Sequence, residues 1–172
     1  MRFTSLIILG CMNVLLLAPG QKALAQDKSR IPPIEIYKTM LNANKNKGWV
    51  QFRNYGGKQL IYFSALQTLH CRLKEIRYSI NSQALDKQFP LVACNPQLPF
   101  SLPPKSGLND IAISLPKGTA KIVVVQIVWD DETKSEVVVY EPCKDVGEQT
   151  CAWPSNLNRV VEMQSPNRAG AK

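Results

Sequence analysis

The chain has 172 residues, of which 45% are hydrophobic, and a formal net charge of +8 at pH 7. The hydrophobic fraction excludes a wholly disordered protein, and the length suits one domain that buries roughly 70% of its unfolded surface. Beyond the N-terminal segment, no apolar stretch reaches the ~20 residues of a membrane-spanning helix, so we expect no transmembrane segment.

Residues 1–25 have the pattern of a secretory signal peptide. Arg2 precedes an apolar run within residues 6–17, and the segment closes on Ala23-Leu24-Ala25. A cationic start, an apolar middle and small residues before the cleavage point are the three parts of such a signal. We therefore expect cleavage after Ala25 and a periplasmic protein, with full secretion as the alternative.

A lipoprotein signal is a second interpretation of this segment. Ile8-Leu9-Gly10-Cys11 resembles a bacterial lipoprotein box, in which Cys11 would carry the lipid. The apolar stretch before Cys11 is very short, and the chain stays apolar after it. The pattern favours an ordinary signal peptide and a protein without a lipid anchor.

Residues 26–47 form a polar and basic lead-in segment. Within it, Pro33–Ala43 has the spacing of a short helix with Ile36, Met40 and Leu41 on one face. An ordered but irregular segment explains the same composition, so both alternatives stay open.

From Gly48 the hydrophobic period changes to two, which is typical of strands. Trp49–Arg53 and Gln59–Phe63 flank a Gly-Gly pair, and this pattern predicts a β-hairpin. Leu69–Ile80 reads as the next strand. Its apolar positions change parity half-way, which predicts a β-bulge near Lys74-Glu75.

The second half of the chain continues in short strands. Phe89–Cys94 is expected to return as a strand. Asn95–Lys105 contains four prolines and is expected to connect the two layers of the fold, with an extended ligand segment as the alternative. Further strands are predicted at Asp110–Leu115, at Ile122–Trp129, which is apolar enough for a central strand, and at Val137–Tyr140.

Roughly six to eight short strands with polar turns predict an all-β fold, an antiparallel β-sandwich. The expected domain spans residues 48–153, and residues 154–172 are expected to form a flexible tail.

Gly48–Tyr140 resembles an immunoglobulin-like or fibronectin III-like module, most clearly at Arg77-Tyr78-Ser79-Ile80-Asn81 and over Ala120–Tyr140. The chain also resembles small exported proteins of Gram-negative bacteria without an assigned function. Cys71 and Cys94 depart from the immunoglobulin pattern because they are too close in sequence for the usual inter-sheet bridge. Such a resemblance implies a fold and no particular activity.

Four cysteines follow the expected cleavage point: Cys71, Cys94, Cys143 and Cys151. An even number in an exported chain predicts two disulfides. Four cysteines allow three pairings, and we favour the two local ones, Cys71–Cys94 and Cys143–Cys151. Disulfides that close loops of these sizes stabilise a fold by roughly 2.5 to 3.5 kcal/mol.

No catalytic residue, metal site or cofactor is predicted. His70 is the only histidine. On a predicted strand, His70 and Cys71 would point to opposite faces, so they would not form a base–nucleophile pair. We expect His70 at the surface. The spacing of cysteines matches neither a zinc site nor a Cys-x-x-Cys redox motif.

The charged residues offer two candidate surfaces. Asp130-Asp131-Glu132 is an acidic cluster that suits a solvated turn better than a calcium site. The basic residues of the first hairpin and the third predicted strand suit an anionic partner, with an ordinary solubilising surface as the alternative. The candidate anion-binding residues are Arg53, Lys58, Arg72, Lys74 and Arg77.

The sequence thus predicts a non-enzymatic binding or structural module of the cell envelope. The expected partner is an envelope protein, an anionic lipid head group or a polysaccharide, and export argues against nucleic acid. An envelope hydrolase with unpaired carboxylates and a secreted virulence or inhibitor protein are the alternatives. The sequence does not indicate an oligomeric state.

Overall fold

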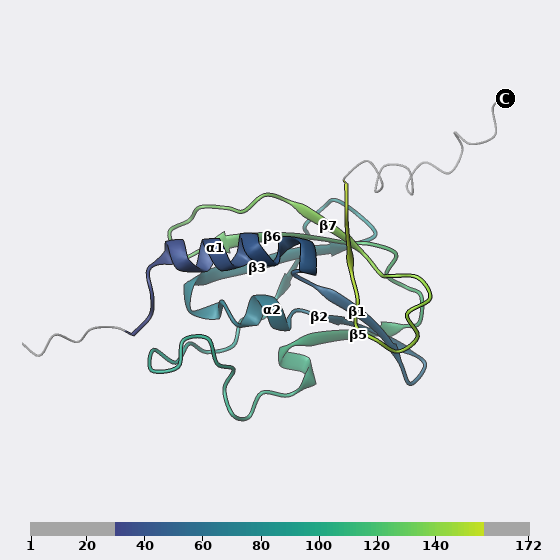
Figure 1. The fold of residues 1–172 in the computed structure, drawn as a ribbon, viewed down its shortest axis with the longest axis horizontal. Helices are drawn as coiled ribbons and strands as arrows, with labels where there is room; N and C mark the ends of the chain where they lie inside the picture. The colour runs from purple at the N-terminus through teal and green to yellow at the C-terminus, as the bar shows by residue number, and fades with distance from the viewer. Residues whose placement is uncertain (1–29, 157–172) are drawn as a thin grey trace, which may run out of the picture.

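The computed structural model describes residues 30–156, so the expected signal peptide, Cys11 and most of the expected tail lie outside the described residues. Eight strands form two antiparallel sheets in this part of the chain (Figure 1). One sheet has the order β1 (Gln51–Tyr55), β2 (Lys58–Tyr62), β5 (Ala112–Pro116). The other has the order β4 (Lys87–Phe89), β3 (Leu73–Ile80), β6 (Val123–Trp129), β7 (Val138–Glu141), β8 (Trp153–Ser155). The prediction of short antiparallel strands is confirmed.

A helix from the lead-in segment packs on this β structure, so the fold is mostly β rather than all-β. Helix α1 (Ile34–Asn44) continues into a 3₁₀ turn, η1 (Lys45–Lys47), and lies on the side of β3 and β6 in Figure 1. Tyr37 and Leu41 are fully buried in the main core, one helical turn apart. Of the expected apolar face, Leu41 and the half-buried Met40 contact the core, whereas Ile36 is 49% exposed, so the expectation was wrong at Ile36.

The first hairpin is formed as predicted. Strands β1 and β2 pair from Gln51 to Tyr55, and Tyr55 lies opposite Lys58. Gly56 and Gly57 form the two-residue turn with φ of +58° and +76°. Both glycines therefore occupy the left-handed region that a hairpin turn of this kind requires and that other residues enter at a cost.

The third strand starts later than predicted. Two short helical turns, α2 (Ser64–Gln67) and η2 (His70–Arg72), precede β3, so the strand begins at Leu73. The register of β3 on β6 shifts between Leu73 and Glu75, which confirms the predicted bulge.

Strand β4 is also displaced from its expected position. It ends at Phe89, the residue at which we expected it to begin. Pro90 follows directly, and proline has no N–H to donate to a ladder. The chain from residue 90 then runs without strand structure, through the 3₁₀ turn η3 (Leu108–Asp110), to β5 in the other sheet. The proline-rich segment is therefore a connector between the two sheets, as expected.

Strand β6 is the centre of the larger sheet. It lies between β3 and β7. Val123, Val125 and Ile127 enter the main core on one face, while Val124 belongs to a second buried cluster on the other. A strand that is covered on both faces explains why this stretch is the most apolar of residues 30–156.

The last segment ties the two sheets together. The N–H and C=O of Cys151 exchange hydrogen bonds of 3.0 Å with those of Phe52 on β1. Trp153–Ser155 then pairs with β7 as an edge strand, so residues 154 and 155 belong to the sheet rather than to a tail. Pro154 is tolerated there because an edge strand leaves one side without ladder bonds. Among the described residues, neither helix is long and apolar enough to cross a bilayer.

Candidate functional site

Both disulfides join the cysteines that the sequence analysis paired. Cys71 and Cys94 have a Cα–Cα distance of 4.8 Å, and Cys143 and Cys151 have one of 5.6 Å. The first bond attaches the connector after β4 to the turn η2. The second closes a small loop just before β8.

His70 lies beside the first disulfide rather than at the surface, so our expectation for this residue was wrong. It is only 4% exposed, and its Nδ1 contacts the carbonyl oxygen of Gln67. Its Nε2 lies 3.6 Å from Cys71 Sγ. The expectation assumed a strand, in which neighbouring side chains alternate. In the 3₁₀ turn η2 that alternation does not apply.

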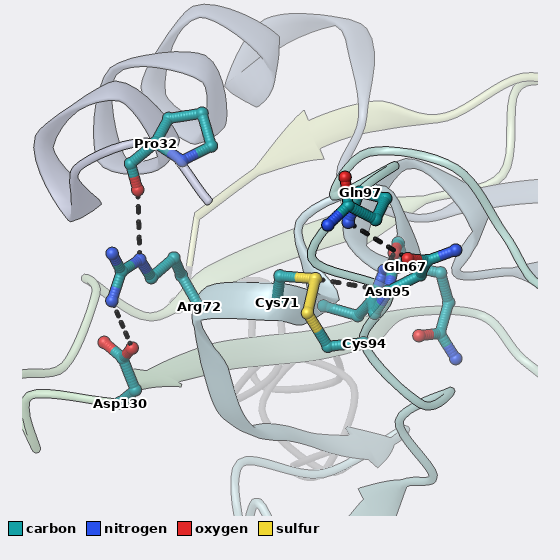
Figure 2. The surroundings of a disulfide bond; sticks show 9 residues. Pro32, Gln67, Cys71, Arg72, Cys94, Asn95, Gln97 and Asp130 are labelled. Atoms are coloured by element: carbon teal, nitrogen blue, oxygen red, sulfur yellow. Dashed lines mark hydrogen bonds and ion pairs between the residues drawn. A yellow bond between two sulfur atoms is a disulfide. The ribbon is translucent and has the colours of Figure 1, made fainter. Parts of the chain in front are cut away.

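Figure 2 shows the surroundings of this disulfide. Gln67 lies near Cys94 and the connector, while Arg72 points the other way. Arg72 Nε donates to the carbonyl of Pro32 at 3.1 Å, and Arg72 Nη1 lies 3.0 Å from the Asp130 carboxylate. The turn therefore separates a sulfur–imidazole cluster from an ion pair.

His70, Cys71 and Cys94 each place one ligand-type atom within 4.8 Å of the others, the one such grouping of three in residues 30–156. Cysteine binds metals as a thiolate. Both sulfurs are joined in the disulfide in this structure. The cluster as it stands brings a histidine nitrogen against a disulfide sulfur.

The carboxylates of the acidic turn are neutralised by cations from α1, η2 and β3. Every carboxylate of the turn has a cation: Asp130 pairs with Arg72, Asp131 with Lys38 and Glu132 with Lys74. Arg77 pairs with Glu75 on its own strand. Three of the five candidate anion-binding residues, Arg72, Lys74 and Arg77, thus have acidic partners, and they do not form an open cationic face.

Asp131 is the most strongly perturbed member of this cluster. Lys38 donates to its carboxylate at 2.8 Å, and the hydroxyl and N–H of Thr133 donate as well. These bonds, that of Lys38 first, lower the pKa of Asp131 from 3.8 to about 2. They join the middle of α1 to the turn after β6.

The lowered pKa predicts an acid-sensitive contribution of Asp131 to stability. Because the folded pKa lies below the unfolded one, the contribution is present above about pH 4 and is lost as the pH falls towards 2. We expect Asp131→Asn to lower the melting temperature at pH 6 and to make no difference near pH 2. Circular dichroism melts across this range measure it. Asp145→Asn, which alters an exposed loop carboxylate, should leave the melting temperature unchanged at both pH values. An equal effect of the two variants would show that the acid sensitivity does not come from the bonds of Asp131.

Two cavities lie where the first hairpin meets the second disulfide loop. One, of about 250 Å³, is bordered by the hairpin turn, Lys58, Lys117 and Glu148. The other, of about 300 Å³, is bordered by the β5–β6 turn and the start of the disulfide loop. Asn54 and Lys117 line both, so the two cavities are neighbours. We call them together the lysine groove.

Four lysines border the lysine groove: Lys58, Lys117, Lys121 and Lys144. In the described part of the chain none of them has an ion-pair partner. Glu141 and Glu148 are the acidic residues of its lining, and Glu141 accepts a hydrogen bond from Ser155 at 2.7 Å. The groove therefore carries a positive excess, in contrast to the neutralised third strand.

The neighbouring strand adds groups of other kinds. Tyr55 is 54% exposed, and the Arg53 guanidinium lies 4.6 Å from the centroid of its ring. Arg53 Nε donates to the carbonyl of Glu148 at 2.8 Å, which holds the disulfide loop against the hairpin. Asn54 Oδ1 is buried and has no hydrogen-bond donor within residues 30–156. Such an acceptor costs about 1 to 3 kcal/mol until a donor reaches it.

The structure thus brings Arg53 and Lys58 together with residues that the sequence analysis did not select. Lys117 lies beside the first hairpin because β2 pairs with β5, and this pairing sets Lys58 opposite Pro116. Lys144 lies at the groove because it belongs to the loop that the Cys143–Cys151 disulfide closes. The turn signal at Pro116-Lys117-Gly118-Thr119 was visible in the sequence, but the pairing that places it beside the hairpin was not.

The chain matches no family model, and its comparison with curated proteins and with solved structures gives no significant match.

Proposed function

We propose that this protein is a non-enzymatic binding module of the bacterial cell envelope that holds an acidic polysaccharide in the lysine groove. The observation that carries the proposal is the set of four lysines around two adjoining cavities, none of which has an acidic partner within residues 30–156. Elsewhere, the exposed cations of α1 and β3 pair with carboxylates of the same molecule. A groove that keeps its cations unpaired attracts an anionic ligand.

The other groups at the groove favour a saccharide over a simple anion. An acidic sugar offers carboxylates to the lysines and hydroxyl groups, which both donate and accept hydrogen bonds, to the other polar groups of the groove lining. Tyr55 adds an exposed aromatic ring beside them. Convergent polar groups with an aromatic side chain are typical of small-molecule and saccharide sites.

Export and an immunoglobulin-like architecture complete the proposal. Two disulfides suit a periplasmic location, because such bonds persist in oxidising compartments. If β1 to β7 take the letters A, B, C, C′, E, F and G, the sheets read A-B-E and C′-C-F-G. Those strand orders support an immunoglobulin-like or fibronectin III-like module with β8 as an added edge strand.

Charge reversal in the groove tests the proposal. We expect Lys58→Glu with Lys117→Glu to weaken binding of a polyuronate such as polygalacturonate by about tenfold to a hundredfold, because two attractions become repulsions. Isothermal titration calorimetry measures the affinity, and neutral dextran should not bind.

A matched variant separates this site from general charge effects. Lys87→Glu with Lys105→Glu makes the same change of net charge on β4 and on the connector after it, and should leave binding within about twofold. Equal weakening by both double variants would contradict a site in the groove. Binding to anionic phospholipid vesicles but not to polyuronate would overturn the choice of ligand.

A further inference from the structure

We propose that the Cys71–Cys94 disulfide is a site of stoichiometric thiol–disulfide exchange assisted by His70, and that its reaction partner is a dithiol. Three features of the described residues carry this inference: the hydrogen bond that places a hydrogen on His70 Nδ1, the unequal exposure of Cys71 and Cys94, and a cavity that Cys94 lines. It is independent of the lysine groove.

The contact at Nδ1 determines which ring nitrogen of His70 carries the proton. A carbonyl oxygen only accepts, so Nδ1–H donates to the oxygen of Gln67 and Nε2 of the neutral ring is an acceptor. That acceptor faces Cys71 Sγ at 3.6 Å in a side chain that is 96% buried by area. A disulfide sulfur has no hydrogen to donate, so Nε2 lacks a donor from Cys71 while the bond is intact.

Reduction of the disulfide gives His70 Nε2 a hydrogen-bond partner. A Cys71 thiol can donate its hydrogen to Nε2, and a Cys71 thiolate can accept one from the protonated ring. Either form satisfies a buried nitrogen that the disulfide leaves without a donor. His70 therefore interacts more favourably with the reduced pair than with the oxidised one, and it favours Cys71 as the sulfur that leaves.

The two cysteines differ in exposure. Cys94 is exposed, whereas Cys71 is half-buried against His70. Cys94, but not Cys71, lines a cavity of about 280 Å³ formed by the proline-rich connector, with Leu98 and Pro103 among its walls. An incoming thiol therefore meets Cys94 Sγ first. Figure 2 shows Cys94 on the connector side of the bond and Cys71 on the side of the turn.

The exchange starts when a thiolate of the dithiol attacks Cys94 Sγ. A bond forms between the incoming sulfur and Cys94, the bond to Cys71 breaks, and its electron pair leaves on Cys71 Sγ. The incoming thiol loses one proton to solvent, and one proton is taken up between Cys71 Sγ and His70 Nε2. The second thiol then attacks the dithiol's own first sulfur in the mixed disulfide. A bond forms between the two sulfurs of the dithiol, the bond to Cys94 breaks, and Cys94 Sγ leaves with the electron pair and takes up a proton as the second thiol loses one. The dithiol is then oxidised and both cysteines are reduced.

The second disulfide provides an internal control in the same molecule. Cys143 and Cys151 are both half-buried, and no histidine lies in the described part of the chain besides His70. We expect limiting dithiothreitol to open Cys71–Cys94 roughly tenfold faster than Cys143–Cys151. Alkylation of the quenched protein followed by peptide mass spectrometry measures both rates. Free cysteine, a monothiol, is expected to leave its adduct on Cys94.

A substitution at His70 tests the role of Nε2. His70→Asn keeps an N–H donor close to the position of Nδ1 and has no counterpart of Nε2. It is expected to slow opening of Cys71–Cys94 roughly tenfold while Cys143–Cys151 keeps its rate. An adduct on Cys71, earlier opening of Cys143–Cys151 or an unchanged ratio of rates in His70→Asn would each overturn the proposal. The first two are measured on the unsubstituted protein and do not depend on how the variant folds.

Discussion

Replacing Gln67 with leucine is expected to lower the free energy of unfolding by about 3 kcal/mol. The Gln67 side chain is fully buried at the end of α2. Its Nε2 donates to the carbonyls of Pro90 and Asp110, at 2.8 and 2.7 Å. Its Oε1 accepts from the N–H of Val92 at 3.4 Å. One amide therefore holds both ends of the connector between the sheets.

Leucine has a similar volume but no polar atoms, so the variant removes these bonds without opening a large cavity. The carbonyls of Pro90 and Asp110 and the N–H of Val92 then lose their hydrogen bonds to the Gln67 amide. Urea unfolding followed by circular dichroism measures the loss. Gln88→Leu makes the same chemical change at an exposed position of β4 and should stay within about 0.5 kcal/mol. Similar losses in the two variants would show that Gln67 does not hold the connector.

Gln67 also shows where the fold could be predicted and where it could not. The hairpin, the bulge and the central strand follow from Gly-Gly, from a parity change and from an apolar run, which are all local signals. Residues 64–72 instead fold into two short helical turns, which bury Leu66 and Gln67 in the core. That preference comes from partners 23 and 43 residues away, which no local pattern contains.

The same limit applies to the candidate sites. Both disulfides join the local pairs that the sequence analysis favoured among the three possible pairings, so they were predicted. The charged surfaces were not, because composition cannot show which cations are already paired. Lys74 and Glu132 are 58 residues apart and meet across β3 and the turn after β6, whereas Lys58 stays unpaired in the described chain. Long-range pairing thus decides which basic residues are left for a ligand.

Replacing Trp49 with alanine is the other change expected to have a large effect, about 3 to 5 kcal/mol in the free energy of unfolding. Trp49 is among the largest fully buried side chains, and its ring centroid lies 6.4 Å from that of Tyr140. Its Nε1 donates to the Leu41 carbonyl at 2.8 Å. Leu41 lies in the last turn of α1, where carbonyls lack partners within the helix.

The free energy lost in Trp49→Ala has two parts, the burial of the ring and the hydrogen bond of the indole N–H, and a second variant separates them. Trp49→Phe keeps most of the buried ring and removes the indole donor, so it should cost about 1 to 2 kcal/mol. Trp153→Ala removes the same side chain from β8, where it is 67% exposed, and should cost about 0.5 kcal/mol or less. Urea unfolding followed by circular dichroism gives all three values. If Trp49→Ala cost no more than Trp153→Ala, α1 would not depend on Trp49, and its other contacts, such as those of Tyr37, Leu41 and Lys38, would have to hold it on the core.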